Sequence, residues 1–225
     1  MKKLIFYILQ YSWLLLGLFL YGAAIVLLLQ ARLGLTPWDV LHQGLTQYLP
    51  FTLGQVMIGV GAILVAITWL LGVKPGIGSI LNMILIGVFV DQIIIWGLFP
   101  APEAMGYRIL YLVVGVLCCG LATGVYITAN LGSGPRDSLM LALHNITGWR
   151  IGPVRTVIEV TVVIVGYLLG GLLGIGTLVF SLTIGWATEF FLTFFHKIGK
   201  TEVFVGFVNG LLEVKEPTIQ QRKSA

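Results

Sequence analysis

The chain has 225 residues, of which 58% are apolar and only 10% are charged, and its formal net charge is +4. No water-soluble domain of this length needs so much apolar surface, so a soluble globular protein is excluded. The basic residues are spread over predicted membrane loops rather than gathered in one patch, which argues against a nucleic-acid-binding surface. We therefore expect a protein embedded in a lipid bilayer.

Six segments are long and apolar enough to cross a bilayer as helices, which takes about 20 residues each. In the first half, residues 1–98, the predicted spans are 11–30, 54–73 and 79–98. In the second half, residues 109–195, they are 109–128, 152–171 and 177–195. Residues 99–108 form a linker whose two prolines end the third span. Residues 196–225 form a tail, in which 202–214 have the spacing of an amphipathic surface helix.

The two halves share many residues at a constant offset of 98 positions. The matching glycines are Gly17–Gly115, Gly22–Gly120, Gly34–Gly132, Gly54–Gly152, Gly72–Gly170, Gly76–Gly174, Gly78–Gly176 and Gly87–Gly185. A register that holds over most of the chain indicates an internal duplication. Because each copy has an odd number of spans, the second copy enters the bilayer from the opposite side. The predicted fold is thus an all-α membrane bundle of two three-span repeats with inverted topology.

Each repeat carries a Gly-x-x-Pro-x-Asp motif after its first span, GLTPWD in the first copy and GSGPRD in the second. Proline favours the first position of a helix, and the residue before it can serve as the N-cap. A helix start presents free N–H groups and a positive dipole end, which suit an anionic or carboxylate group. The candidate substrate-binding residues are therefore Thr36, Pro37, Trp38, Asp39, Gly134, Pro135, Arg136 and Asp137. The alternative is that Asp39 and Asp137 only cap their own helices.

The segments after the motifs, 37–50 and 135–148, are about 14 residues long and too short to cross the bilayer straight. We predict that they form short helices that lie at the interface or dip into the membrane as re-entrant segments. If they cross instead, each repeat has four spans and the two halves are parallel. Arg136, at the start of the second segment, suits either an anionic group bound bidentately or a cytoplasmic anchor.

The loops between the spans give an orientation and two turns. Most lysines and arginines fall on the side of both termini, so the termini are predicted to be cytoplasmic. The second and third spans of each repeat are joined through Gly-Ile-Gly, at 76–78 and at 174–176. We predict tight turns with positive φ there, which glycine tolerates.

Four ionisable residues lie inside predicted spans: Asp91, Arg155, Glu159 and Glu189. A charge at the bilayer centre costs at least about 2.5–3.5 kcal/mol, so such residues pair or face a polar cavity. Arg155 and Glu159 are four residues apart, which predicts an ion pair along one helix face. Asp91 and Glu189 are repeat equivalents and are candidate proton-coupling carboxylates. The alternative is that they pair with basic residues near the headgroups.

The sequence contains no Walker-type phosphate loop, no His-Glu-x-x-His pattern and no nucleophile elbow. The three histidines are scattered, and the adjacent Cys118 and Cys119 are read as small packing residues. Asn82 is expected to help helices pack. We therefore expect no enzymatic activity, no metal and no cofactor, with an enzyme that acts on a lipid or lipid-linked substrate as the remaining alternative.

The stretches LGLTPWDVLHQGL, LGSGPRDSLMLAL, VRTVIE and LGGLLGIGTL resemble the YczE/YyaS/YitT-type group of bacterial integral membrane proteins. The resemblance covers residues 11–195 and is closest to the YczE-like branch. It implies a compact bundle in the bacterial inner membrane without an assigned activity. Members of this group are often described as transporters. Links to regulators of the pyridoxal-phosphate-binding type imply transport of vitamin B6 or amino compounds.

The leading hypothesis is a secondary transporter of a small polar solute, anionic or zwitterionic, bound between the two repeats. Asp91 or Glu189 would carry a coupling proton. The alternative is a non-transporting subunit or sensor that docks a second copy or a membrane partner protein. Gly166, Gly170 and Gly174 would then form a packing ridge on the fifth span. Convergence of Asp39, Asp91, Asp137 and Glu189 on one cavity would favour the transporter.

Overall fold

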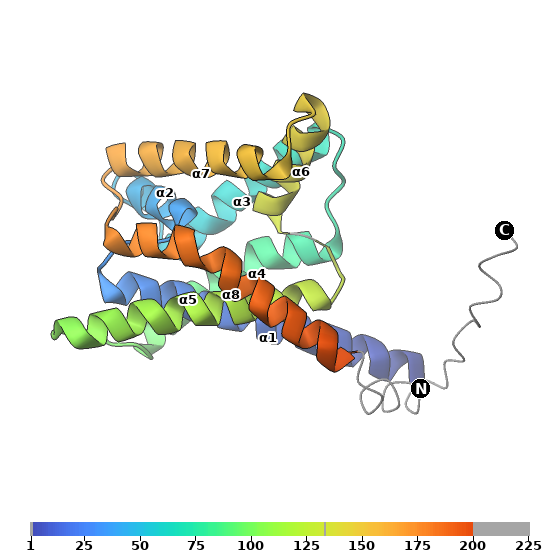
Figure 1. Cartoon of the computed structure of the whole chain (residues 1–225), viewed down its shortest axis with the longest axis horizontal. Helices are drawn as coiled ribbons and strands as arrows, with labels where there is room; N and C mark the ends of the chain where they lie inside the picture. Colours follow the sequence, from blue (N-terminus) through green and yellow to red (C-terminus); the bar gives the residue numbers. More distant parts are fainter. Residues whose placement is uncertain (1, 133, 200–225) are drawn as a thin grey trace, which may run out of the picture.

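The computed structural model describes residues 2–132 and 134–199, and within these ranges it contains eight α-helices and no β-strand. The helices are α1 (Lys2–Ala31), α2 (Pro37–Thr46), α3 (Leu53–Leu70), α4 (Ile77–Trp96), α5 (Met105–Thr128), α6 (Pro135–Thr147), α7 (Ile151–Leu168) and α8 (Ile175–Gly199). Figure 1 shows α1 and α5 running together on one side of the molecule and α7 on the opposite side. The predicted all-α fold is confirmed. The predicted tail helix at 202–214 lies outside the described residues.

Six of these helices are long and apolar enough to cross a membrane. The candidate spans are Tyr7–Ala31, Leu53–Leu70, Ile77–Trp96, Met105–Thr128, Ile151–Leu168 and Ile175–Lys197. Each one overlaps one predicted span. The third ends before the linker prolines, because Gly97 takes a left-handed conformation with φ of 62° and stops α4 there. The linker is also shorter than predicted, since α5 begins at Met105.

The two motif helices, α2 and α6, begin at the predicted prolines. Thr36 is the N-cap of α2, and its hydroxyl accepts a hydrogen bond from the Asp39 N–H at 3.2 Å. Gly134 is the N-cap of α6. With 10 and 13 residues, these helices extend only about 15–20 Å, whereas the hydrocarbon core is about 30 Å thick. They are therefore short connecting helices, and neither spans the membrane.

The centre of the fold is the antiparallel crossing of α1 and α5. A Cβ on Gly17 would lie 2.8 Å from the backbone nitrogen of Tyr126, and one on Gly115 would lie 2.9 Å from the Leu28 side chain. Only glycine lets the two helices approach this closely. The two contacts exchange under the offset of 98, since Gly17 corresponds to Gly115 and Leu28 to Tyr126.

The Gly-Ile-Gly segments do not turn as predicted. Positive φ occurs instead at Gly72 (92°) and Gly170 (87°), which follow the ends of α3 and α7. This prediction was wrong because each turn is made by the glycine that ends the preceding helix. The later glycines provide close backbone contacts: the Gly78 N–H donates to the Leu131 carbonyl at 2.8 Å, and the Gly176 N–H donates to the Leu33 carbonyl at 2.7 Å.

The two halves differ in how their last two long helices meet. In the first half α3 packs on α4, and Gly54 and Gly87 bring the two backbones together. In the second half, a Cβ on Gly152 or Gly185 would find no neighbouring atom within 4 Å among the described residues. Figure 1 shows α7 and α8 diverging from their common turn. The long contact of α7 is with α2, where Gly166 contacts Leu41.

Candidate functional site

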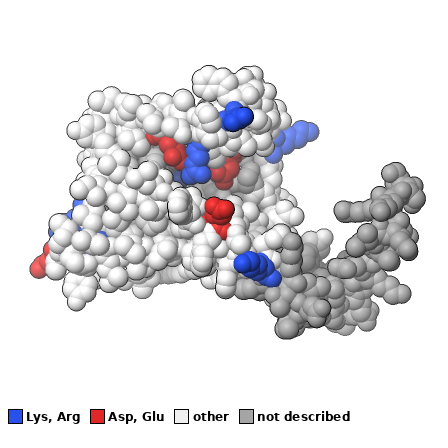
Figure 2. Space-filling view, viewed as in Figure 1, with Lys and Arg blue, Asp and Glu red and all other residues white. Residues whose placement is uncertain are grey.

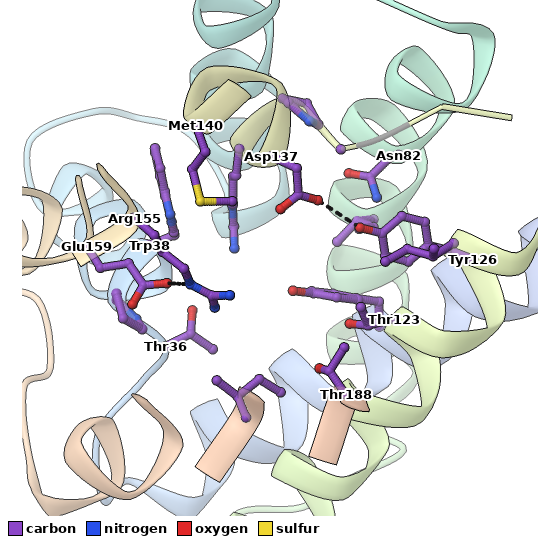
Figure 3. Close-up of a pocket in the computed structure, with 18 of the residues that line it drawn as sticks. Thr36, Trp38, Asn82, Thr123, Tyr126, Asp137, Met140, Arg155, Glu159 and Thr188 are labelled. Carbon is purple, nitrogen blue, oxygen red and sulfur yellow. Dashed lines mark hydrogen bonds and ion pairs between the residues drawn. The ribbon is translucent and has the colours of Figure 1, made fainter. Parts of the chain in front are cut away.

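A cavity of about 490 Å³ lies between the two halves, and all eight helices contribute to its lining. This volume is within the range of small-molecule sites, about 300–1,000 Å³. Its polar and charged lining consists of Tyr21, Thr36, His42, Asn82, Thr123, Tyr126, Arg136, Asp137, Arg155, Glu159, Thr188, Glu189 and Thr193, with the indole of Trp38 beside them. Figure 3 draws 18 of the lining residues around the open centre and labels ten of them. In Figure 2 acidic and basic side chains gather in the hollow of this face between α7 and α8.

The structure brings ten of the twelve predicted site residues to this cavity. They are Thr36, Pro37, Trp38, Gly134, Pro135, Arg136, Asp137, Arg155, Glu159 and Glu189. The two others are Asp39, which lies behind the wall, and Asp91, which lies elsewhere. The starts of α2 and α6, which are about a hundred residues apart in the chain, therefore face one cavity.

Asp39 is buried behind the cavity wall, with only 1% of its surface exposed. Its carboxylate accepts hydrogen bonds from the Thr36 hydroxyl at 2.6 Å and from His42 Nδ1 at 3.0 Å. Arg136 Nη2 reaches the same carboxylate from α6 at 3.4 Å. Asp39 thus holds Arg136 in place, and it neither contacts the cavity nor only caps its own helix.

The electrostatics of this buried cluster favour an ionised carboxylate and a neutral imidazole. Burial raises the pKa of Asp39, but the hydrogen bond from His42 and the charge of Arg136 outweigh it and lower the pKa below its usual value. Burial also lowers the pKa of His42, more than Asp39 raises it. Because the ionised carboxylate can only accept, the neutral His42 ring donates its Nδ1–H.

Arg136 is held between a carboxylate and an aromatic ring. Its guanidinium carbon lies 5.3 Å from the centroid of the Trp38 ring, a cation–π contact. The side chain of Arg136 stays 27% exposed and lines the cavity. Arg136 therefore presents a fixed positive charge to the cavity from the start of α6.

Asp137 faces the cavity with a partner that the sequence did not indicate. The hydroxyl of Tyr126 on α5 donates to its carboxylate at 3.0 Å, as Figure 3 shows. The signal for this missed residue is the spacing of Thr123 and Tyr126, two polar residues three positions apart within an apolar span. Such a pair shares one helix face, and here that face lines the cavity.

On the α7–α8 side of the cavity, Arg155 and Glu159 form the predicted ion pair. Arg155 Nε lies 2.7 Å from Glu159 Oε1. Glu189 lines the cavity from α8, next to Thr188. The cavity thus contains two guanidiniums, each paired with a carboxylate, and two further carboxylates, Asp137 and Glu189.

Asp91 has a different environment from its repeat equivalent Glu189. It accepts hydrogen bonds from the Gly54 N–H at 2.8 Å and from the Thr52 hydroxyl, so it fixes the start of α3 against α4. It does not line the cavity. The four carboxylates named by the sequence therefore do not all converge, because the α3–α4 contact takes Asp91 away from the space that Glu189 faces.

The predicted glycine ridge on the fifth span is not a free surface. Gly166 packs against Leu41 of α2, and Gly174 contacts Leu33. Gly170 and Gly174 lie beyond the end of α7 at Leu168, in the turn before α8. These glycines therefore serve packing within the chain. Within the described residues no group of three His, Cys, Asp or Glu side chains could hold a metal ion.

Comparison with known proteins places the chain in a family. Residues 8–193 match the family described as "Family of unknown function (DUF6198)". The chain is 36% identical over 185 residues to "Uncharacterized membrane protein YczE" of Bacillus subtilis, covering 81% of this chain and 85% of that protein. An uncharacterized protein of Haemophilus influenzae is 33% identical over 83% of this chain and 85% of its own length.

A third relative, "Uncharacterized protein YyaS" of Bacillus subtilis, is 26% identical over 75% of this chain and 85% of its own length. No solved structure matches the chain significantly. The matches confirm the resemblance to the YczE and YyaS proteins that the sequence stretches indicated. Together with the six apolar helices, they identify the chain as a membrane protein that belongs to this family of unknown function, DUF6198.

Proposed function

We propose that the protein is a secondary transporter of a small zwitterionic solute across the bacterial inner membrane. The observation that carries this proposal is the charged cavity between the two halves, where the starts of α2 and α6 meet. In transporters built from inverted repeats, short or broken helices present their N-termini to the solute at the repeat interface. The arrangement of α2 and α6 fits that description.

Support for an inverted repeat comes from contacts that exchange under the offset of 98. Gly22 lies against Phe89 in the first half, and Gly120 lies against Ala187 in the second. The turn glycines behave in the same way, since Gly78 contacts Leu131 and Gly176 contacts Leu33. Because α1 and α5 are antiparallel, the two turn contacts, at Leu131 and at Leu33, lie at opposite ends of the bundle. Such a pattern is what a pseudo-two-fold axis in the membrane plane produces.

The charges of the cavity favour a solute with an amino group as well as an acidic group. Arg136 is the one guanidinium held by a carboxylate outside the cavity lining, and it suits the acidic group of a ligand. Asp137 accepts a hydrogen bond from the neutral Tyr126 hydroxyl, and Glu189 lines the cavity, so both carboxylates suit an ammonium group. The sequence suggested an anionic or zwitterionic solute. Because the cavity has more carboxylates than guanidiniums, we favour a zwitterionic solute over an anionic one.

Charged residues also support a direction of insertion and a residue that carries a coupling proton. Lys2 and Lys3 at the start of α1 and Lys197 at the end of α8 favour a cytoplasmic location of these two helix ends. Glu189 faces the cavity and is the carboxylate best placed to exchange a proton with it. Asp91 does not line the cavity. We therefore assign coupling to Glu189 alone.

The test is a thermal-stability scan of the detergent-purified protein against amino acids, B6 vitamers, organic monoamines and dicarboxylates. A ligand at about 100 times its dissociation constant adds about 2.7 kcal/mol to the stability of the folded protein. We expect a shift with zwitterions that is lost in Asp137→Asn and kept in Glu103→Gln, an exposed carboxylate outside the cavity. A ligand found in this way would then be tested for counterflow into proteoliposomes. Absence of any shift with the whole panel would contradict the proposed solute class, and binding without counterflow would contradict transport.

A further inference from the structure

The closed contact between α3 and α4 depends on a small set of residues at the start of α3. Thr52 is the N-cap of α3, and its hydroxyl donates to Asp91 of α4. The Gly54 N–H donates to the other oxygen of the same carboxylate at 2.8 Å. Gly54 and Gly87 remove the side chains that would keep the two backbones apart. One carboxylate on α4 thus fastens the first turn of α3.

The second half has residues at the four corresponding positions, but they do not form the corresponding contacts in this structure. At the offset of 98, Thr52 becomes Arg150, Gly54 becomes Gly152, Gly87 becomes Gly185 and Asp91 becomes Glu189. Arg150 is the exposed N-cap of α7, as Thr52 is the N-cap of α3. Glu189 faces the cavity, and Gly152 and Gly185 have no neighbours within 4 Å among the described residues. A glycine inside a helix costs about 1 kcal/mol relative to alanine, and the present arrangement gives these two no compensating contact.

The two sets lie at opposite ends of the bundle. The α3–α4 turn contacts Leu131, just after the end of α5, and the α7–α8 turn contacts Leu33, just after the end of α1. Since α1 and α5 are antiparallel, the turns mark opposite ends. Each set lies away from its own turn. The α3–α4 contact therefore closes one end of the cavity, and a corresponding α7–α8 contact would close the opposite end.

We propose that Arg150, Gly152, Gly185 and Glu189 form a gate, which is open in this structure and closes when α7 packs on α8. In the closed gate Glu189 accepts hydrogen bonds from the Gly152 N–H and from Arg150, as Asp91 does from Gly54 and Thr52. Closing this gate is accompanied by opening of the α3–α4 contact, so the cavity faces one end at a time. This inference depends on the proposed transport function, for which it supplies the alternating movement.

The experiment is a spin-label distance measurement on two matched pairs, in the full chain with Cys118→Ser and Cys119→Ala. One pair is Val157→Cys with Leu182→Cys, both exposed positions on α7 and α8. The equivalent pair is Gly59→Cys with Ile84→Cys on α3 and α4, where a Cβ on Gly59 would meet no described atom within 4 Å and Ile84 is exposed. In lipid nanodiscs we expect a long and a short population for each pair, with the long population of one pair matching the short population of the other.

Variants identify the gate residues. Glu189→Gln should lower the ratio of short to long α7–α8 distances at least about tenfold, because a charge-assisted contact is lost. The charge exchange Arg150→Glu with Glu189→Arg should restore the part of the ratio that depends on the ion pair, but not the part from the Gly152 N–H, because arginine cannot accept a hydrogen bond. A purely structural role of either residue would give no recovery. Gly185→Leu should abolish the short α7–α8 distance although its side chain has space in the open state. Gly59→Leu in the α7–α8 labelled protein is the control and should change nothing.

A single α7–α8 distance in the unaltered protein, in both nanodiscs and detergent, would overturn the gate. So would a short population that Glu189→Gln and Gly185→Leu leave unchanged. The measurement uses no solute, so it is independent of the ligand scan. Two α7–α8 distance populations without a ligand-induced shift in melting temperature would support the gate and contradict the proposed solute class. A ligand-induced shift in melting temperature with a single α7–α8 distance would support the binding site and contradict the gate.

Discussion

The guanidinium of Arg136 lies over the ring of Trp38, 5.3 Å from its centroid, and these two residues occupy equivalent positions of motifs that are 98 residues apart. In the inverted repeat that we propose, a contact between equivalent positions lies on the pseudo-two-fold axis that relates the two copies. Identical residues there would meet themselves, and two arginines would repel each other. The replacement of Trp38 by Arg136 in the second copy turns this meeting point into a favourable cation–π contact. The motifs therefore differ where the halves touch.

Removal of Arg136 should destabilise the protein more than removal of an exposed lysine. Arg136→Ala leaves Asp39 buried without its cation, although Thr36 and His42 still donate to it. We expect a loss of about 2–3 kcal/mol, seen as a lower melting temperature in detergent. Arg136→Lys should lose less. Lys74→Ala, at an exposed position, should change the stability by no more than about 0.5 kcal/mol. Equal effects of the Arg136 and Lys74 variants would mean that the Asp39 pair contributes nothing.

The α1–α5 crossing should not accept a larger residue at its glycines. In Gly17→Val the new Cβ would lie 2.8 Å from the backbone nitrogen of Tyr126, where no flexible side chain can move away. The helices must separate, at a cost of about 1–3 kcal/mol or more. The folded fraction by size-exclusion chromatography should fall sharply. Gly59→Val, where no described atom lies within 4 Å, should behave like the unaltered protein. A well-folded Gly17→Val would show that the crossing is looser than described.

Asp91 and Glu189 should have opposite profiles in stability and ligand response. Asp91→Ala removes the acceptor of the Gly54 N–H and the Thr52 hydroxyl, and should cost about 0.5–2 kcal/mol of stability. It should leave ligand-induced shifts intact, because Asp91 does not line the cavity. Glu189→Ala should change the melting temperature little and weaken the ligand shift. If Asp91→Ala abolished ligand binding at unchanged stability, Asp91 would belong to the site.

Much of the fold could be predicted from the sequence, because membrane spans need long apolar segments and each of the six has one. The starts of α2 and α6 could also be predicted, because proline and the residue before it mark the first turn. The sequence could not predict in which half the last two long helices would pack against each other. Asp91 and Glu189 are equivalent in sequence, and only the packing of α3 on α4 separates a helix-fixing carboxylate from a cavity-lining one. Tyr126 was missed because its partner Asp137 comes from a different helix.

While the α7–α8 contact is open, the cavity should admit water from one side of the membrane only. Thr188 and Trp186 are two residues apart on α8, but Thr188 lines the cavity, whereas Trp186 lies outside it and is 82% exposed. With Cys118→Ser and Cys119→Ala, a cysteine at position 188 should react with a charged, membrane-impermeant thiol reagent. A cysteine at position 186 should not, because on a membrane span this exposed face contacts lipid, and a thiolate does not form there.

The side of access is set by the open ends of α7 and α8, which lie at the end of the bundle where α1 begins. With cytoplasmic termini, Thr188→Cys should be modified in inside-out vesicles and protected in right-side-out vesicles, with at least about a tenfold difference in rate. The Gly185→Leu variant, which keeps the gate open, should remove any residual reaction from the outer side. Modification from the outer side alone would reverse the predicted orientation. Equal modification from both sides that Gly185→Leu leaves unchanged would mean a pore, which is incompatible with a cavity closed at one end by Asp91 and the start of α3.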